Sequence, residues 1–343
     1  MPVYEIRAAL PSDEEQLLAV ARHLNTVNLP HDRGAIRDIL ALSQKSFLGE
    51  IDVKKREYVF VLRDLDQDRV IGTSMIISQL GRRDAPYIFF DVLEEEKYSA
   101  TLDRHFAHTV LRIGYSYNGP TEIGGLILLP EYRRVPERLG QFLSYVRFLY
   151  VATHRAQFRD EVLAELLPPL EADGTSHLWE ALGRHFTGLS YAEADVLSKN
   201  NKEFIKQLFP EGTIYASVLS QQAQDVIGKV GAQTKGVEKL LRRIGFRYAH
   251  RVDPFDGGPH FTAMTDEVSL VQHARRAKVT RIEGAGGVLR KGLVARETRE
   301  APFFRAVLGS LDHPSRAGAH IGRDVADHLG VAEGDEVLSL PLE

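Results

Sequence analysis

Cysteine is absent from the 343-residue sequence. Its absence excludes disulfide bonds, zinc sites with cysteine ligands, iron–sulfur clusters and a thiol nucleophile. Any chemistry in this chain must therefore use oxygen and nitrogen side chains, backbone amides or a bound cofactor.

Long apolar runs are absent as well. The longest one, Gly124–Pro130, has the length of a buried strand, whereas a membrane-spanning helix needs about 20 apolar residues. The N-terminal segment lacks a basic stretch followed by an apolar one, so a secretory signal is not expected. We therefore expect a cytoplasmic protein without a membrane partner.

The sequence has little excess charge of either sign. It contains 43 Lys and Arg against 47 Asp and Glu, a net charge of −4. A general nucleic-acid binder would be basic, so we expect no nucleic-acid partner. A chain of this length exceeds the usual size of a single core, which predicts one large domain with an appendage, or two domains.

Common nucleotide and metal motifs are missing too. No Walker A sequence is present, and no strand-like run is followed by G-x-G-x-x-G, so a nucleoside triphosphate or a dinucleotide is not expected. His105 and His108 are three residues apart, but no third ligand follows at helical spacing. We expect no metal site.

The hydrophobic patterns predict strands and helices in irregular alternation. A hairpin is predicted from Tyr58–Arg63 and Val70–Ser78, which a polar turn separates. A buried strand at Thr121–Leu129 leads through a basic loop into a helix from about Leu139, and Val162–Leu167 is the next strand. Composition shifts near residue 275, after which strand-like pieces and one short helix follow. We predict an α+β protein with domains 1–275 and 276–343.

The basic loop is the first candidate site. Between Tyr132 and Arg155 there are five arginines and one acid. The loop lies between the end of a strand and the start of a helix, where free amides and the helix dipole favour anions. The candidate phosphate ligands are Arg133, Arg134, Arg138 and Gly140. The alternative is a solvated basic loop without a ligand.

Two further candidates are acidic or can transfer protons. The DPFDGGPHF segment places Asp256 and His260 beside two glycines, where a carboxylate suits a cationic ligand and a histidine suits proton transfer. The alternative is a turn with a structural aspartate. Glu122 lies within the apolar strand, where a carboxylate is costly to bury unless it is paired or functional. It is either a base or a side chain at the solvated end of the strand.

The strands, the anion-binding loop between a strand and a helix, and the LLRRIGFRY segment together resemble the acyl-CoA N-acyltransferase (GNAT) superfamily. A closer resemblance is to the arginine N-succinyltransferase family. It rests on segments that recur in order along the chain: YVFVL (58–62), FRDEVLAEL (158–166), SHLWEALGRHF (176–186), FIKQLFP (204–210), LSQQAQDVIGKV (219–230), FDGGP (255–259) and GDEV (334–337).

The resemblance implies a GNAT-like, mixed, strongly twisted β-sheet flanked by helices, with a small β-rich C-terminal extension. It also implies succinyl transfer from succinyl-CoA to the α-amine of L-arginine in arginine catabolism, with no tightly bound cofactor. Leu126 matches the leucine that contacts succinyl-CoA in the family. Direct attack by the amine is expected, with Glu122 as base and a backbone N–H near Leu126 for the oxyanion. Asp225 or Asp256 would pair with the substrate guanidinium.

The chain departs from the family pattern at two places. The family's proton-donor histidine follows the DVIG string, and this position is Gly231 here. The loop at Arg133 is also two residues longer than usual. His260 is a substitute acid, or no acid is needed. Two alternatives therefore stay open: an acyltransferase for another cationic amine such as ornithine, and a non-catalytic CoA-binding subunit. A homo- or hetero-oligomer is compatible with either.

Overall fold

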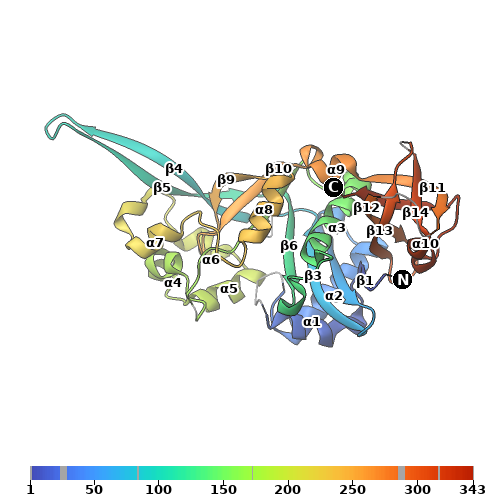
Figure 1. Ribbon diagram of the computed structural model, residues 1–343. Coiled ribbons are helices and arrows are strands. Elements are labelled where there is room, and N and C mark those ends of the chain that lie inside the picture. Colours follow the sequence, from blue (N-terminus) through green and yellow to red (C-terminus); the bar gives the residue numbers. More distant parts are fainter. Residues whose placement is uncertain are drawn as a thin grey trace. The chain divides into compact units, whose positions relative to one another are not determined.

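The computed structural model describes residues 2–23, 29–82, 85–171, 173–284, 290–315 and 317–342. The chain is an α+β protein with two compact units (Figure 1). The first consists of residues 1–78, 121–160 and 265–343, and the second of residues 79–120 and 161–264. Each unit is therefore assembled from segments that are far apart in the sequence. Among the described residues, no helix is long and apolar enough to cross a membrane.

The main sheet of the first unit is built from consecutive antiparallel neighbours. In spatial order its strands are β13 (Phe304–Asp312), β1 (Tyr4–Ala8), β2 (Glu57–Asp64), β3 (Arg69–Ile77) and β6 (Thr121–Leu128). The β2–β3 pair confirms the predicted hairpin. The inner strands are buried over most of their length, which explains why their sequences are apolar nearly throughout.

Three longer helices accompany this sheet: α1 (Glu14–Ala21), α2 (Arg33–Leu48) and α3 (Leu139–Thr153). The carboxylate of Asp32 caps α2 by accepting a hydrogen bond of 2.7 Å from the amide of Ala35. Helix α3 follows β6 and is buried over most of its surface. Short 3₁₀ turns are η1 (Pro11–Asp13), η2 (Val53–Lys55), η3 (Pro130–Tyr132), η4 (Arg155–Gln157) and η7 (Thr265–Glu267).

The C-terminal part of the first unit is rich in strands, as predicted. Its elements are α9 (Ser269–His273), β11 (Arg275–Glu283), β12 (Arg290–Glu297), β14 (Gly318–Gly322), α10 (Arg323–Leu329) and β15 (Glu336–Pro341). The β11–β14 pair is parallel, whereas β12 runs antiparallel to β13 and β15. Apolar side chains from these strands and from α10 form a core of their own.

The second unit has a sheet in the order β7–β10–β9–β4–β5–β8. Its strands are β4 (Tyr87–Ser99), β5 (Arg104–Ser116), β7 (Glu161–Glu165), β8 (Ile214–Tyr215), β9 (Arg247–Val252) and β10 (Pro259–Met264). The β4–β5 hairpin projects from the rest of its unit as a long arm (Figure 1). The sequence predicts a strand only at Tyr87–Val92, because the arm beyond it is exposed and polar.

The helices of the second unit enclose a core around Trp179. They are a π-helical turn η5 (Trp179–Gly183), α4 (Arg184–Thr187), α5 (Tyr191–Asn200), α6 (Glu203–Leu208), η6 (Ala216–Val218), α7 (Gln221–Val226) and α8 (Lys235–Arg243). Gly245 follows α8 with a φ of 114°, a backbone conformation that favours glycine, and β9 begins two residues later.

Candidate functional site

Strand β6 contains a bulge at Gly125 and Leu126. Thr73 of β3 pairs with Ile127, but Met75 pairs with Gly124, so two residues of β6 lie opposite one residue of β3. Gly125 has a φ of 55°, and a Cβ atom there would lie 2.7 Å from the sulfur of Met75. Both observations favour glycine at this position. A bulge interrupts the ladder and leaves backbone groups available for a ligand.

Leu126, the predicted acyl-donor contact, lies in this bulge. It is half-buried, whereas Ile127 and Leu128 of the same strand are buried. The hydrogen-bonding groups of an interrupted strand are suited to hold the carbonyl of a thioester. The sequence identified Leu126 through the family resemblance, but it did not predict the bulge.

The predicted phosphate loop joins β6 to α3. Arg133, Arg134 and Arg138 are all exposed, and the Nε of Arg133 donates to the carbonyl of Leu128 at 2.9 Å. Arg138 adopts a φ of 56° at the start of α3. The amides of Leu139 and Gly140 belong to the first turn of α3, so they have no acceptor within the helix. Basic side chains and free amides therefore occur together here.

A cavity of about 170 Å³ lies beside this loop. Arg138 and Gln141 line it together with Lys291 of β12, whose Nζ is 3.4 Å from the carbonyl oxygen of Glu137. Two cations therefore border the hollow at the start of α3. Lys291 is a basic residue of this site that the sequence analysis missed, because it lies about 150 residues further along the chain.

Glu122, the predicted base, also lies on β6. It is 5% exposed and pairs in register with Ile77 of β3. Its burial agrees with the apolar sequence around it. Glu122 and Leu126 therefore belong to the same strand of the first unit, whereas the remaining predicted catalytic and substrate-binding residues belong to the second unit.

Gly231 lies in a tight loop before α8. Its amide donates to the carbonyl of Leu167 at 2.8 Å. A Cβ atom at this position would lie only 2.6 Å from the carbonyl oxygen of Pro168. The loop is therefore fitted to glycine, and a histidine side chain would require the backbone to move.

His260 is fully buried on β10. Its Nδ1 lies 2.6 Å from the hydroxyl of Tyr87, and its Nε2 has no hydrogen-bond partner among the described residues. Burial, together with the charges of Arg251 and Lys202, lowers the pKa of His260 to about 3. The imidazole is thus neutral at pH 7 and has no imidazolium proton to donate.

Asp256 forms part of the turn that precedes β10. It is buried, and its Oδ1 accepts a hydrogen bond of 2.7 Å from the amide of Gly258. Burial and the nearby charge of Asp253 raise the pKa of Asp256 well above its usual value. Asp225 lies apart from this turn, on α7, where it accepts a hydrogen bond of 2.9 Å from the side chain of Gln221.

Asp253 and Glu165 place further carboxylates near His260. One ligand atom from each of these three residues lies within 4.8 Å of the others. Glu165 Oε1 is 3.6 Å from His260 Nε2, and burial raises the pKa of Asp253. This group could hold a divalent cation or a positively charged organic group. Sequence spacing could not find it, because the three residues come from two strands and a turn.

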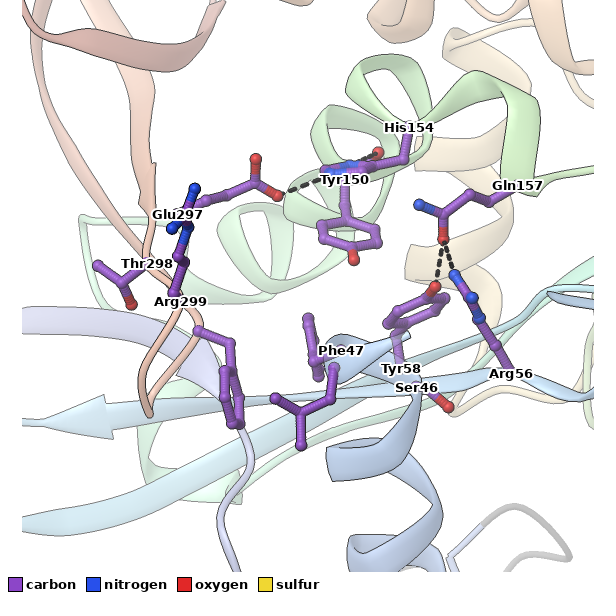
Figure 2. Close-up of a pocket in the computed structure, with 12 residues that line it drawn as sticks. Ser46, Phe47, Arg56, Tyr58, Tyr150, His154, Gln157, Glu297, Thr298 and Arg299 are labelled. Carbon is purple, nitrogen blue, oxygen red and sulfur yellow. Dashed lines mark hydrogen bonds and ion pairs between the residues drawn. The ribbon is translucent and has the colours of Figure 1, made fainter. Parts of the chain in front are cut away.

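A cavity of about 320 Å³ opens elsewhere in the first unit (Figure 2). In its lining, the side-chain oxygen of Gln157 accepts hydrogen bonds from Tyr58 and Arg56. The Nε2 of His154 lies 2.8 Å from the Oε1 of Glu297, which also lines the cavity. The Oε2 of Glu297 also forms an ion pair of 3.0 Å with the Nη2 of Arg276, so its charge is already compensated. None of the predicted site residues lines this cavity.

Comparison with known proteins identifies the family. The family model described as "Arginine N-succinyltransferase beta subunit" matches residues 4–270, and its C-terminal domain matches residues 275–341. The arginine N-succinyltransferase of Yersinia enterocolitica is 33% identical over 330 residues, covering 95% of this chain and 93% of that protein. The enzyme of the same name from Escherichia coli is 32% identical over 335 residues, covering 97% and 96%.

A solved structure agrees with these sequence matches. The arginine/ornithine succinyltransferase subunit AI of Pseudomonas aeruginosa superposes with a TM-score of 0.83, at 26% identity and with 99% of both chains covered. The protein is therefore an acyltransferase-family chain of the α+β class. More specifically, it belongs to the arginine N-succinyltransferase family.

Proposed function

We propose that this chain transfers the succinyl group of succinyl-CoA to the α-amine of L-arginine, giving N2-succinylarginine and free CoA. The observation that carries the proposal is the bulge at Leu126, which is followed directly by a basic loop at the start of α3. This arrangement occurs in a chain that matches the arginine N-succinyltransferase family over nearly its whole length. No tightly bound cofactor is required, because succinyl-CoA serves as a co-substrate.

The donor is held by the first unit in this proposal. Arg133, Arg134, Arg138 and the amide of Gly140 bind the phosphates of CoA through charge-assisted hydrogen bonds. The thioester carbonyl lies at Leu126, where a backbone N–H stabilises the oxyanion. In this proposal residues 1–275 form the GNAT-like domain, and residues 276–343 form the C-terminal extension, which contributes Lys291 to the border of the donor site.

The acceptor is cationic, and the acids of the second unit suit it. The guanidinium of arginine pairs with carboxylates in a planar, bidentate manner. Asp256, Asp225 and the neighbouring Asp253 provide the candidate partners. Burial raises the pKa values of Asp253 and Asp256, and a bound guanidinium would lower them again by stabilising the ionised forms.

The reaction proceeds without an acyl-enzyme. The α-amine loses a proton to Glu122, directly or through water, and its nitrogen attacks the thioester carbon. A C–N bond forms, the C–S bond breaks and the CoA thiolate leaves. His260 is neutral at pH 7, so the thiolate acquires its proton from solvent or from the protonated base. Positioning of the two substrates supplies much of the rate.

Gly231 favours a second candidate function, since the family's proton-donor histidine is absent. The chain would then act on another cationic amine such as ornithine, or it would bind CoA as the non-catalytic member of an oligomer. We place the protein in the cytoplasm under either proposal.

Steady-state release of the CoA thiol distinguishes these functions. The purified chain is assayed with L-arginine and L-ornithine, each with succinyl-CoA and acetyl-CoA. Because the protein has no cysteine, the thiol reagent gives little background. Saturable release with succinyl-CoA and arginine supports the proposal. CoA release with ornithine but not with arginine would support the other acceptor. Binding of succinyl-CoA without release of CoA would support the non-catalytic subunit.

A further inference from the structure

Arg147 is a buried cation in the middle of α3. It is 2% exposed, and its Nε donates to the carbonyl of Ser144 at 3.1 Å. Its Nη1 donates to the carbonyl of Gly124 at 3.3 Å and its Nη2 to the hydroxyl of Ser144 at 3.0 Å. All three acceptors are uncharged. Among the residues that the structure describes, no carboxylate contacts Arg147.

Such a charge is unfavourable without an anion. Removing a guanidinium from water is costly, and neutral acceptors compensate for only part of the loss. Burial disfavours the charged form and lowers the pKa of Arg147 to about 9. The side chain is nevertheless charged at neutral pH. A buried cation without a counter-ion, next to an interrupted strand, is characteristic of a ligand site rather than of a core.

The register of the sheet places Arg147 beside the bulge. Gly72 of β3 pairs with Leu128, and a Cβ atom on Gly72 would lie 2.9 Å from a methyl group of Leu143 on α3. Arg147 follows Leu143 by one helical turn on the same face. It reaches Gly124, the last regularly paired residue of β6 before the bulge.

Ser74 adds an unpaired donor to the same layer. It lies on β3 opposite the bulge, and it shares with Gly72 the face that α3 covers. Its hydroxyl is fully buried and has no hydrogen-bond partner among the described residues. An unpaired hydroxyl and a guanidinium without a carboxylate partner therefore belong to the layer in which α3 packs on β3 and β6, close in register to Leu126.

We propose that Arg147 and Ser74 bind the terminal carboxylate of the succinyl group and thereby select a dicarboxylic acyl donor. This inference rests on the proposed function, in which the thioester lies at Leu126. The two oxygens of a carboxylate match the fork of a guanidinium, and the hydroxyl of Ser74 donates a further hydrogen bond. An acyl group that ends in a methyl leaves the guanidinium of Arg147 without a counter-ion and the hydroxyl of Ser74 without a hydrogen bond.

The test compares succinyl-CoA with butyryl-CoA, which carries a methyl in place of the carboxylate. Binding of each thioester to the full chain is measured by calorimetry, so the result does not depend on turnover. The variants are Arg147→Met, Arg147→Lys and Ser74→Ala. Arg323→Met, at the exposed start of α10, is the matched control. Ser74→Ala removes no hydrogen bond seen in the structure, so its fold is expected to be intact even if Arg147→Met is unstable.

Wild-type protein is expected to bind succinyl-CoA at least about 10-fold more tightly than butyryl-CoA. Arg147→Met should abolish that preference, Ser74→Ala should reduce it by about 3- to 10-fold, and Arg147→Lys should retain part of it. Butyryl-CoA affinity should change little in each case. Equal wild-type affinities, or equal losses for both thioesters, would overturn the inference. Preferential binding without transfer to arginine would instead reject the proposed function and leave the carboxylate site in place.

Discussion

Replacing Gly231 with histidine restores the side chain that the family pattern has at this position, and we expect it to be harmful. The Cβ of the new residue would lie 2.6 Å from the carbonyl oxygen of Pro168, whereas ordinary contacts begin near 3.4 Å. The loop would have to move by about 0.8 Å, the difference between these two distances. This movement would strain the hydrogen bonds that Gly231 and Thr234 donate to the carbonyl of Leu167, at 2.8 and 2.9 Å.

Overpacking of this kind costs about 1–3 kcal/mol in the free energy of unfolding. For a protein of this size each kcal/mol corresponds to a fall in Tm of about 1–2 °C. Thermal unfolding followed by circular dichroism measures the change, and CoA-thiol release measures turnover in the same samples. We expect a lower Tm and no gain in turnover.

Gly236→His is the matched control. Gly236 lies in the first turn of α8, with nothing within 4 Å of the position of its Cβ. The same substitution there should leave Tm within about 1 °C, since exposed substitutions change stability by less than about 0.5 kcal/mol. An unchanged Tm for Gly231→His together with a rise in turnover would refute the reasoning. The loop would then accept the histidine side chain, and the glycine would mark the loss of a catalytic residue with no structural requirement behind it.

The remaining predictions concern the base, the phosphate loop and the buried turn. Glu122→Gln should lower kcat about 10²- to 10⁴-fold with little change in the KM for succinyl-CoA, and an unchanged kcat would exclude Glu122 as the base. Arg138→Ala should raise the KM for succinyl-CoA several-fold, most strongly at low salt, while a KM that does not respond would remove this residue from the donor site. Asp256 has a raised pKa, so its contribution to stability is present at low pH and is lost as pH rises toward the folded-state value, by at most about 1.4 kcal/mol per pH unit. Urea unfolding between pH 5 and pH 8 should therefore show a stability advantage of Asp256→Asn that grows with pH, and an advantage independent of pH would contradict this.

Some of this architecture could be predicted from the sequence. The β2–β3 hairpin and the succession β6, basic loop, α3 follow from local patterns, because buried strands are apolar and an amphipathic helix repeats every few residues. The positions of Glu122 and of the arginines at the start of α3 follow from the same elements. These features depend on short stretches of chain.

Other features depend on contacts between distant segments. The bulge at Leu126 arises only from the register with β3, which the sequence of β6 does not contain. The burial of His260 could not be predicted, because histidine occurs both in cores and at surfaces. Arginine usually lies at the surface, and Arg147 was grouped with the exposed loop. Lys291 reaches the phosphate loop from a remote strand.

The most direct test of the account is to identify the product. The purified chain is incubated alone with succinyl-CoA and L-arginine labelled with ¹⁵N at the α-position, and the product is analysed by mass spectrometry and NMR. The account predicts one succinyl group on the labelled nitrogen for each CoA released. Succinylation of another nitrogen, or the absence of any product while succinyl-CoA binds, would contradict it.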